Sequence, residues 1–248
     1  MSLSLNKIFA HAGRDLLIRE LTLDSRNVRA GDLFLAVPGG KFDGRDHIAD
    51  ALQRGAAAVA YEVEGAIVLP ITDVPLIPVK GLAAQLSDIA GRFYGDPSRT
   101  LNLVGVTGTN GKTTTVGLLR HLLDSPEHPA ASIGTLGVLV GSDGVAMPGG
   151  SGLTTPGPVE LQKLLRELVD RGVRTVTMEV SSHSLDQRRV DGITFAAAVF
   201  TNLTRDHLDY HGTMEQYRAA KLRLVGLLAR DGVALFNADD PAWRGVAN

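Results

Sequence analysis

The residues that most clearly point to chemistry lie between Thr107 and Thr114, in the run Thr-Gly-Thr-Asn-Gly-Lys-Thr-Thr. An apolar, β-branched stretch leads into this run, and an apolar pattern at helical spacing follows it. A strand, a glycine-containing loop and a helix in this order form a cradle, because backbone N–H groups and the helix N-terminus bind phosphate oxygens. The lysine adds a positive charge, and the threonine hydroxyl after it can bind Mg²⁺. We therefore predict an ATP site that includes Gly108, Thr109, Asn110, Gly111, Lys112, Thr113 and Thr114.

This loop departs at one position from the G-x-x-x-x-G-K-[ST] pattern, because Val106 stands where the first glycine is expected. A loop and helix that contain Gly-Lys-Thr by chance are the alternative. The surrounding alternation of strands and helices favours the nucleotide site.

A carboxylate follows a second predicted strand, where the ligands of open α/β sheets collect. Glu179 ends an apolar run that begins at Thr175, and Ser181, Ser182 and His183 come soon after it. A carboxylate there could hold a phosphate-bound Mg²⁺, because this ion favours one or two carboxylates with phosphates and water. The alternative is a serine pair that caps a helix beside an incidental glutamate.

A third strand end is rich in histidine and aspartate. Asp206, His207, Asp209 and His211 lie within a short run after the strand predicted for 196–201. A solvated loop with capping aspartates and surface histidines is the alternative. Loops held by a rigid sheet are where sites are built, so we favour a functional role.

Lys221 lies in an apolar helical stripe, because Tyr217, Leu224, Val225 and Leu228 recur around it at helical spacing. A buried lysine is costly unless it is neutral or paired. Its stem could instead carry the amine to the surface. A lysine with a lowered pKa could also be modified and become a metal ligand, and the spacing leaves these alternatives open.

The composition limits the classes of function. The 248 residues, 44% of them hydrophobic, can form the cores of one or two domains. A net charge of −2 gives no basic surface for nucleic acid or anionic membrane, and no cysteine is present for a thiolate metal site. No signal-peptide core and no apolar run near the ~18 residues of a membrane span occur. We expect a cytoplasmic protein without nucleic-acid or membrane partners.

The elements that must position these residues form an α/β fold in two domains. Residues 1–98 predict a small α/β domain, and the breaking residues at 95–98 separate it from 99–248. In the second domain strands and helices alternate, as a mostly parallel sheet with covering helices requires. We expect strands at 32–37, 56–60, 101–107, 131–135, 175–180, 196–201 and 233–237, helices at 47–54, 81–93, 112–123, 159–169 and 214–228, and a glycine-rich loop at 141–152. Residues 243–248 form no obvious cap, so we expect a truncated sheet.

These motifs together resemble the Mur ligase family of ATP-dependent amide-bond synthetases, over all 248 residues. The run from Asp206 to His211 is typical of the branch that adds the third residue of the peptidoglycan stem peptide. The resemblance implies a UDP-muramoyl substrate domain at 1–98 and a central ATP-binding domain of the P-loop type at 99–248. Besides the phosphate loop, it rests on the segments 23–26, 31–34, 153–156, 178–183, 201–212 and 217–221.

The resemblance also implies roles for the matching residues. The residues expected to bind the UDP-muramoyl-dipeptide are Leu23, Ser25, Thr154, Thr155, Ser181, Gln187 and Arg189. The ligands expected for two Mg²⁺ ions are Thr113, Glu179, His207 and Lys221, the lysine as a carbamate. The expected catalytic residues are Lys112, Glu179, His207 and Lys221.

The implied reaction joins meso-diaminopimelate or L-lysine to UDP-MurNAc-L-Ala-D-Glu through an acyl phosphate, with ATP as energy source and a monomer as catalyst. The third domain of the family, which carries the amino-acid pocket, is not in this sequence, so we expect poor ligation by these residues alone. One alternative is a related ligase such as a folylpolyglutamate synthetase, against which the Asp24-Ser25-Arg26 turn argues. The other is a non-catalytic fragment that binds the UDP substrate, although every expected ATP and metal residue is present.

Overall fold

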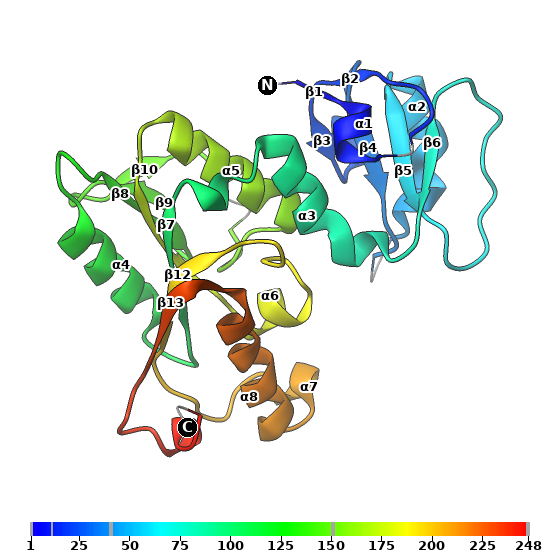
Figure 1. The fold of residues 1–248 in the computed structure, drawn as a ribbon. Helices are drawn as coiled ribbons and strands as arrows, with labels where there is room; N and C mark the ends of the chain where they lie inside the picture. Colours follow the sequence, from blue (N-terminus) through cyan, green and yellow to red (C-terminus); the bar gives the residue numbers. More distant parts are fainter. Residues whose placement is uncertain (1, 11, 40–41, 150–151, 247–248) are drawn as a thin grey trace. The chain divides into compact units, whose positions relative to one another are not determined.

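Figure 1 shows a computed structural model of the chain, which describes residues 2–10, 12–39, 42–149 and 152–246. The chain folds as two compact units, Met1–Gly95 and Asp96–Asn248. The division falls within the segment 95–98, where the glycine, aspartate and proline interrupt the helical pattern.

The first unit contains a parallel sheet with the strand order β3-β4-β5-β6. Every residue of β4 and β5 is buried, as expected for apolar runs inside a parallel sheet. A separate antiparallel pair, β1 and β2, precedes it. The bounds are β1 Leu3–Ser4, α1 Leu5–Ile8, β2 Leu17–Ile18, β3 Leu21–Thr22, β4 Leu33–Ala36, α2 Ile48–Gln53, β5 Ala58–Glu62, β6 Leu76–Val79 and α3 Leu82–Tyr94.

The second unit contains a sheet with the order β10-β9-β8-β11-β7-β12-β13. The strands from β8 to β13 in this order are parallel, and β9 and β10 are antiparallel at one edge. The loops that follow β7, β11 and β12 therefore meet at one edge of the sheet. The strand bounds are β7 Asn102–Thr107, β8 Ala130–Gly134, β9 Gly137–Val140, β10 Val145–Met147, β11 Thr175–Glu179, β12 Phe195–Phe200 and β13 Leu228–Phe236.

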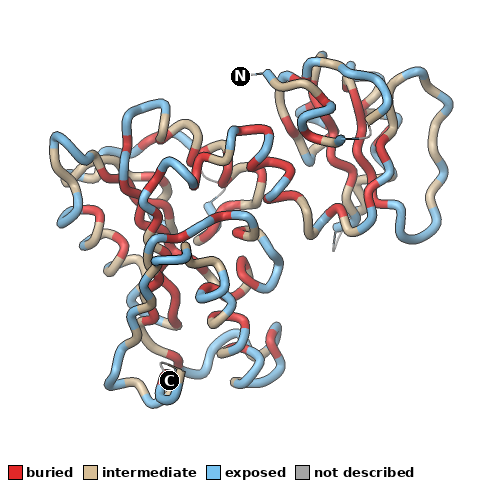
Figure 2. Tube along the Cα trace, in the orientation of Figure 1, coloured by how far each residue is buried: buried red, intermediate tan, exposed pale blue. Residues whose placement is uncertain are grey.

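Helices cover both faces of this sheet (Figure 1). On one face the hydroxyl of Thr177 donates to the carbonyl of Val116 in α4 at 3.0 Å. On the other face Met178 packs in the hydrophobic core with Leu161 of α5, and Figure 2 shows buried backbone along the central strands. The helix bounds are α4 Lys112–Leu123, α5 Pro158–Asp170, α6 Ser182–Asp186, α7 Leu208–His211 and α8 Met214–Leu222.

The predicted glycine-rich loop at 141–152 is wrong at residues 145–147, which form β10 and pair with β9 in an antiparallel hairpin. Gly141 and Gly144 adopt positive φ angles of 74° and 69° and make the turn between the two strands. The glycines thus indicated a hairpin turn rather than an extended loop. Residues 150 and 151 of the predicted loop lie outside the described residues.

The predicted helix at 214–228 is too long. The α-helix ends at Leu222, a 3₁₀ turn covers Arg223–Leu227, and Leu228 pairs with Phe195 as the first residue of β13. The apolar spacing continues through this segment, but pairing with the edge of β12 draws the chain into the sheet earlier than the spacing indicates.

Within the described ranges, no helix combines the length and the apolar character that a membrane crossing needs.

Candidate active site

The loop that the sequence predicts to bind phosphate lies between β7 and α4. Gly108 has a φ of 147°, and a Cβ atom there would collide with the hydroxyl of Thr201. Gly111 has a φ of 83° and precedes the first residue of α4. Val106, which replaces the usual first glycine, is a buried residue of β7, so the chain leaves the strand through Gly108 instead.

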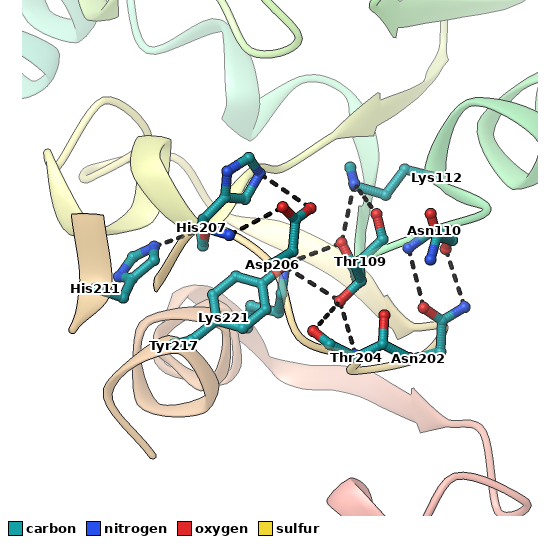
Figure 3. Close-up of polar contacts among 12 residues, drawn as sticks. Thr109, Asn110, Lys112, Asn202, Thr204, Asp206, His207, His211, Tyr217 and Lys221 are labelled. Carbon is teal, nitrogen blue, oxygen red and sulfur yellow. Dashed lines mark hydrogen bonds and ion pairs between the residues drawn. The ribbon is translucent and has the colours of Figure 1, made fainter. Parts of the chain in front are cut away.

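The neighbouring strand end holds this loop (Figure 3). The amide of Thr109 donates to the carbonyl of Asn202 at 2.8 Å, and the amide of Asn110 donates to the Asn202 side-chain oxygen at 2.9 Å. The hydroxyl of Thr201 donates to the carbonyl of Asn110 at 2.7 Å. The loop is therefore tied to the segment that follows β12. Asn202 lies in the strand-end motif, but sequence reasoning assigned it no role.

Lys112 turns its amine back onto the loop. Its Nζ donates to the carbonyls of Gly108 and Thr109, each at 2.9 Å. Burial lowers the pKa of Lys112, and the charges of Glu179 and Asp206 oppose that shift. The amine of Lys112 thus lies beside the backbone of the predicted phosphate loop.

Glu179 lies at the carboxyl end of β11 and contacts the first turn of α4. The hydroxyl of Thr113 donates to its Oε1 atom at 2.9 Å, and the amide of Thr135 donates to the same oxygen at 2.9 Å. Glu179 is buried, and a Cβ atom at Gly134 would overlap its carboxylate. The structure therefore brings together Thr113 and Glu179, which are far apart in the sequence. Thr135 and Gly134 were missed because nothing in their local sequence indicates a carboxylate nearby.

The structure contains the serine cap that the alternative interpretation of the segment after Glu179 expects. The side chain of Ser181 accepts a hydrogen bond from the amide of Ser184 and caps α6. The hydroxyl of Thr155 donates to the carbonyl of Glu179 at 2.9 Å and accepts from the amide of Ser181 at 3.1 Å. The same segment thus supplies a buried carboxylate and a helix cap.

The predicted dipeptide-binding residues of this unit form one network. Arg189 donates through Nε and Nη2 to the side-chain oxygen of Gln187 at 3.0 and 2.6 Å, and through Nη1 to the carbonyl of Thr155 at 3.1 Å. The hydroxyls of Thr135 and Thr154 lie 3.3 Å apart. The network therefore connects the segment 154–155 with the residues after α6.

Lys221 is buried, with 1% of its surface exposed, so the alternative in which its stem carries the amine to the surface is wrong. Its Nζ donates to the carbonyl of Gly108 at 2.9 Å and lies 4.5 Å from the centre of the Tyr217 ring. Burial and the nearby charge of Lys112 lower the pKa of Lys221 to about 7, and Asp206 opposes the shift. Near neutral pH a large fraction of this amine is uncharged.

His207 belongs to a cluster of aromatic rings. Its ring packs edge-on against His183 with centroids 4.8 Å apart and lies 6.1 Å from the ring of Tyr217. His183 also contacts Tyr210 and His211 at 4.3 and 5.4 Å. Burial lowers the pKa values of His183 and His211.

Among the described residues, no group of three or more histidine, aspartate and glutamate side chains is arranged to hold a metal ion. The polar contacts join Thr113 with Glu179, and separately Lys221 with Gly108. His207 contacts Asp206 at 3.4 Å. The four predicted metal ligands therefore do not form one contact network.

The two predicted substrate residues of the first unit share a pocket of about 500 Å³. Leu23 and Ser25 line it together with Phe34 and His47. Asp24 lies on the same wall, and its carboxylate accepts hydrogen bonds from the backbone and side chain of Arg26. The Asp-Ser-Arg turn thus lines a cavity large enough for a small ligand.

Two family models match the chain. The Mur ligase middle domain matches residues 106–248, and the catalytic domain of the Mur ligase family matches residues 17–94. The chain belongs to the Mur ligase family.

Close relatives carry a more particular name. The chain is 67% identical over 247 residues to the UDP-N-acetylmuramoyl-L-alanyl-D-glutamate--2,6-diaminopimelate ligase of Pseudomonas syringae pv. tomato, covering 100% of this chain and 50% of that protein. It is 59% identical over 250 residues to the ligase of that name from Pseudomonas aeruginosa, again covering 100% and 50%. A solved structure of a ligase of this name aligns with a TM-score of 0.76 and 30% identity over 97% of this chain and 48% of that one. The chain spans about half the length of these relatives.

Proposed function

We propose that this chain carries the UDP-substrate and ATP sites of a ligase that joins 2,6-diaminopimelate to UDP-MurNAc-L-Ala-D-Glu in peptidoglycan synthesis. The contact between Thr113 of the phosphate loop helix and Glu179 at the end of β11 carries this proposal. It brings together at one sheet edge a hydroxyl and a carboxylate, which are suited to hold the Mg²⁺ ion that phosphoryl transfer uses. The chain in which they meet belongs to the Mur ligase family. The names of the relatives favour diaminopimelate over lysine as the added amino acid.

We assign nucleotide binding to the loop from Gly108 to Thr114. Its amides and the N-terminus of α4 are suited to phosphate oxygens. The amine of Lys112 would leave the carbonyls of Gly108 and Thr109 and pair with the phosphates, a stronger partner for a cation.

The residues present fit Mg²⁺. Thr113 and Glu179 offer a hydroxyl and a carboxylate within contact of each other, and hard oxygen ligands of this kind suit this ion when phosphates and water complete its shell. When bound, Mg²⁺ supplies charge neutralisation for the transferred phosphoryl group. A second Mg²⁺ site with His207 and Lys221 belongs to the same proposal.

Lys221 is proposed to carry a carbamate. The uncharged amine adds to the carbon of CO₂ and releases one proton to solvent, which turns a potential cation into an anion. Burial of Lys221 and the lowered pKa support this reaction, because it needs the neutral amine. An anionic group there also removes the repulsion between the amines of Lys221 and Lys112.

The chemistry proceeds in two transfers. The γ-phosphate of ATP passes to the free carboxylate of the D-glutamyl residue, and the amine of the amino acid then displaces phosphate to form the amide. Lys112 neutralises charge on the phosphates, while Thr155, Gln187 and Arg189 hold the acceptor dipeptide. Ser25 and Leu23 hold the UDP part. Such catalysis consists mainly of positioning and electrostatic stabilisation.

Calorimetric titration of UDP-MurNAc-L-Ala-D-Glu and of a non-hydrolysable ATP analogue with Mg²⁺ tests the proposal. The wild-type chain should bind both. Lys112→Ala should lose only the analogue, and Ser25→Ala should weaken only the UDP substrate. Binding of the UDP substrate without the analogue would favour a non-catalytic binding module. Binding of a folate in place of the UDP substrate would favour a folylpolyglutamate synthetase.

We also propose that the chain acts in the cytoplasm as a monomer, with small molecules as its partners. The net charge of −2 supports the absence of a nucleic-acid partner.

A further inference from the structure

Tyr217 of α8 contacts the phosphate loop directly. It lies on α8 with 1% of its surface exposed, and its hydroxyl is 3.2 Å from the hydroxyl of Thr109. The Thr109 hydroxyl donates to the carbonyl of Thr204 at 3.2 Å and accepts from the amide of Thr204 at 3.0 Å. With its proton directed to Thr204, the Thr109 oxygen accepts from Tyr217.

The ring of the same tyrosine contacts three other groups of the site (Figure 3). The amine of Lys221 lies 4.5 Å from its centre. The rings of His207 and His211 lie 6.1 and 5.2 Å away. One side chain thus joins the phosphate loop to α7 and α8.

Packing alone does not explain why the side chain at position 217 carries a hydroxyl group. A phenylalanine would fill the same space, whereas burying a hydroxyl is unfavourable unless it forms a hydrogen bond. The partner of this hydroxyl is Thr109, in the middle of the loop and remote from Tyr217 in the sequence. The buried polar group therefore makes a long-range connection to the loop.

We propose that Tyr217 is a positioning residue of the nucleotide site, whose hydroxyl fixes Thr109 in the phosphate loop while its ring packs against the end of the Lys221 side chain. The loop and the lysine then keep their places before a nucleotide binds. The consequence for ATP affinity rests on the proposed function, but the restraint on the loop does not.

The restraint is measured by hydrogen exchange of the backbone amides of residues 108–112 in the nucleotide-free 248-residue chain. Tyr217→Phe removes only the hydroxyl and should speed this exchange about three- to tenfold, the effect of one ordinary hydrogen bond. Tyr94→Phe is the matched control, because it removes a buried tyrosine hydroxyl that bonds Glu20 in the first unit. It should leave exchange at 108–112 unchanged.

A double-mutant cycle separates this bond from a general loosening of the fold. Thr109→Val removes the same contact from the other side, so the double variant with Tyr217→Phe should exchange no faster than the more affected single variant. If the two substitutions multiplied each other's effect on the exchange rate, or if Tyr217→Phe left that rate unchanged, the proposal that the Tyr217 hydroxyl restrains the loop would be wrong.

The ring is tested through the side-chain NMR signal of Lys221 at fixed pH, assigned with Lys221→Met. Tyr217→Phe should keep the ring-current shift of this signal, and Tyr217→Leu should abolish it. A signal that is the same in all three proteins would overturn the role of the ring.

Nucleotide binding gives a third readout. Tyr217→Phe should weaken binding of the ATP analogue about three- to tenfold. A wild-type chain that binds no analogue would count against the proposed function, while the exchange data would still decide the role of Tyr217.

Discussion

The side-chain amines of Lys112 and Lys221 donate to the same acceptor, the carbonyl of Gly108, each at 2.9 Å. Two lysines that converge on one backbone oxygen repel each other when both are charged. Lys221, the more deeply buried of the two, loses its proton first as the pH rises, because burial and the charge of Lys112 together lower its pKa to about 7. The two amines therefore differ in charge near neutral pH, which is the basis of the separate roles proposed above for Lys112 and Lys221.

The stability of the second unit should therefore rise with pH in a defined range. Unfolded Lys221 has a pKa of 10.5 and folded Lys221 one of about 7. Between these values the unfolded chain binds the extra proton, so raising the pH favours the folded state by up to about 1.4 kcal/mol per pH unit. Below pH 7 both states hold the proton and this contribution no longer changes.

Urea unfolding followed by the fluorescence of Trp243, the single tryptophan and a buried core residue of this unit, measures the effect. Buffers free of CO₂ keep the amine unmodified. Lys221→Met should remove the rise between pH 7 and 10.5. An identical pH dependence in both proteins would contradict the lowered pKa.

Lys112→Ala should abolish turnover in the full-length ligase and leave binding of the UDP substrate nearly intact. The reason is that Lys112 lies in the phosphate loop, and the pocket with Ser25 is in the other unit. In the same variant the pKa of Lys221 should move up towards its ordinary value, because one neighbouring charge is gone. Strong residual ligation would refute the assignment of the loop.

Glu179→Gln should weaken the effect of Mg²⁺ on nucleotide binding without weakening nucleotide binding itself. The amide keeps an oxygen for the hydrogen bonds from Thr113 and Thr135 but removes the negative charge that attracts Mg²⁺. We expect the enhancement of ATP-analogue affinity by Mg²⁺ to fall at least roughly tenfold, with affinity in EDTA nearly unchanged. Titrations with and without Mg²⁺ measure this ratio, and an unaltered ratio would exclude Glu179 as a ligand.

Gly108→Ala should damage the loop by two effects. Its φ of 147° is unfavourable for an L-residue, and the added methyl group would collide with the hydroxyl of Thr201. Gly137→Ala is a matched control, since Gly137 has a φ of 84° and open space around a Cβ atom. The control should cost about 1–2 kcal/mol of unfolding free energy, and Gly108→Ala more.

Only Gly108→Ala should also lower the affinity for the ATP analogue, by at least roughly tenfold. Equal urea midpoints and equal affinities in the two variants would contradict the close approach of Thr201.

The nucleotide loop and α4 could be predicted because their signals are local. The expected helix 112–123 matches the observed bounds Lys112–Leu123, since glycine turn, lysine and apolar spacing all occur within a short run. Glu179 could be predicted as a strand-end carboxylate for a less local reason, namely that parallel strands end at a common edge.

Contacts between distant segments could not be predicted. The amide of Thr135 on Glu179 and the side chain of Asn202 on the loop depend on the strand order β8-β11-β7-β12, which the sequence does not specify. The 3₁₀ turn after Leu222 was missed for a similar reason, because sheet pairing at Leu228 overrides helical spacing.

The hydrogen bonds from Thr201 and Asn202 to the phosphate loop have a thermodynamic consequence. A flexible glycine loop loses conformational entropy when it closes on a ligand. Here the residues that follow β12 hold the backbone of Thr109 and Asn110 by hydrogen bonds. These bonds fix the loop in advance, so a phosphate ligand of the kind proposed above would spend less of its interaction energy on ordering the loop.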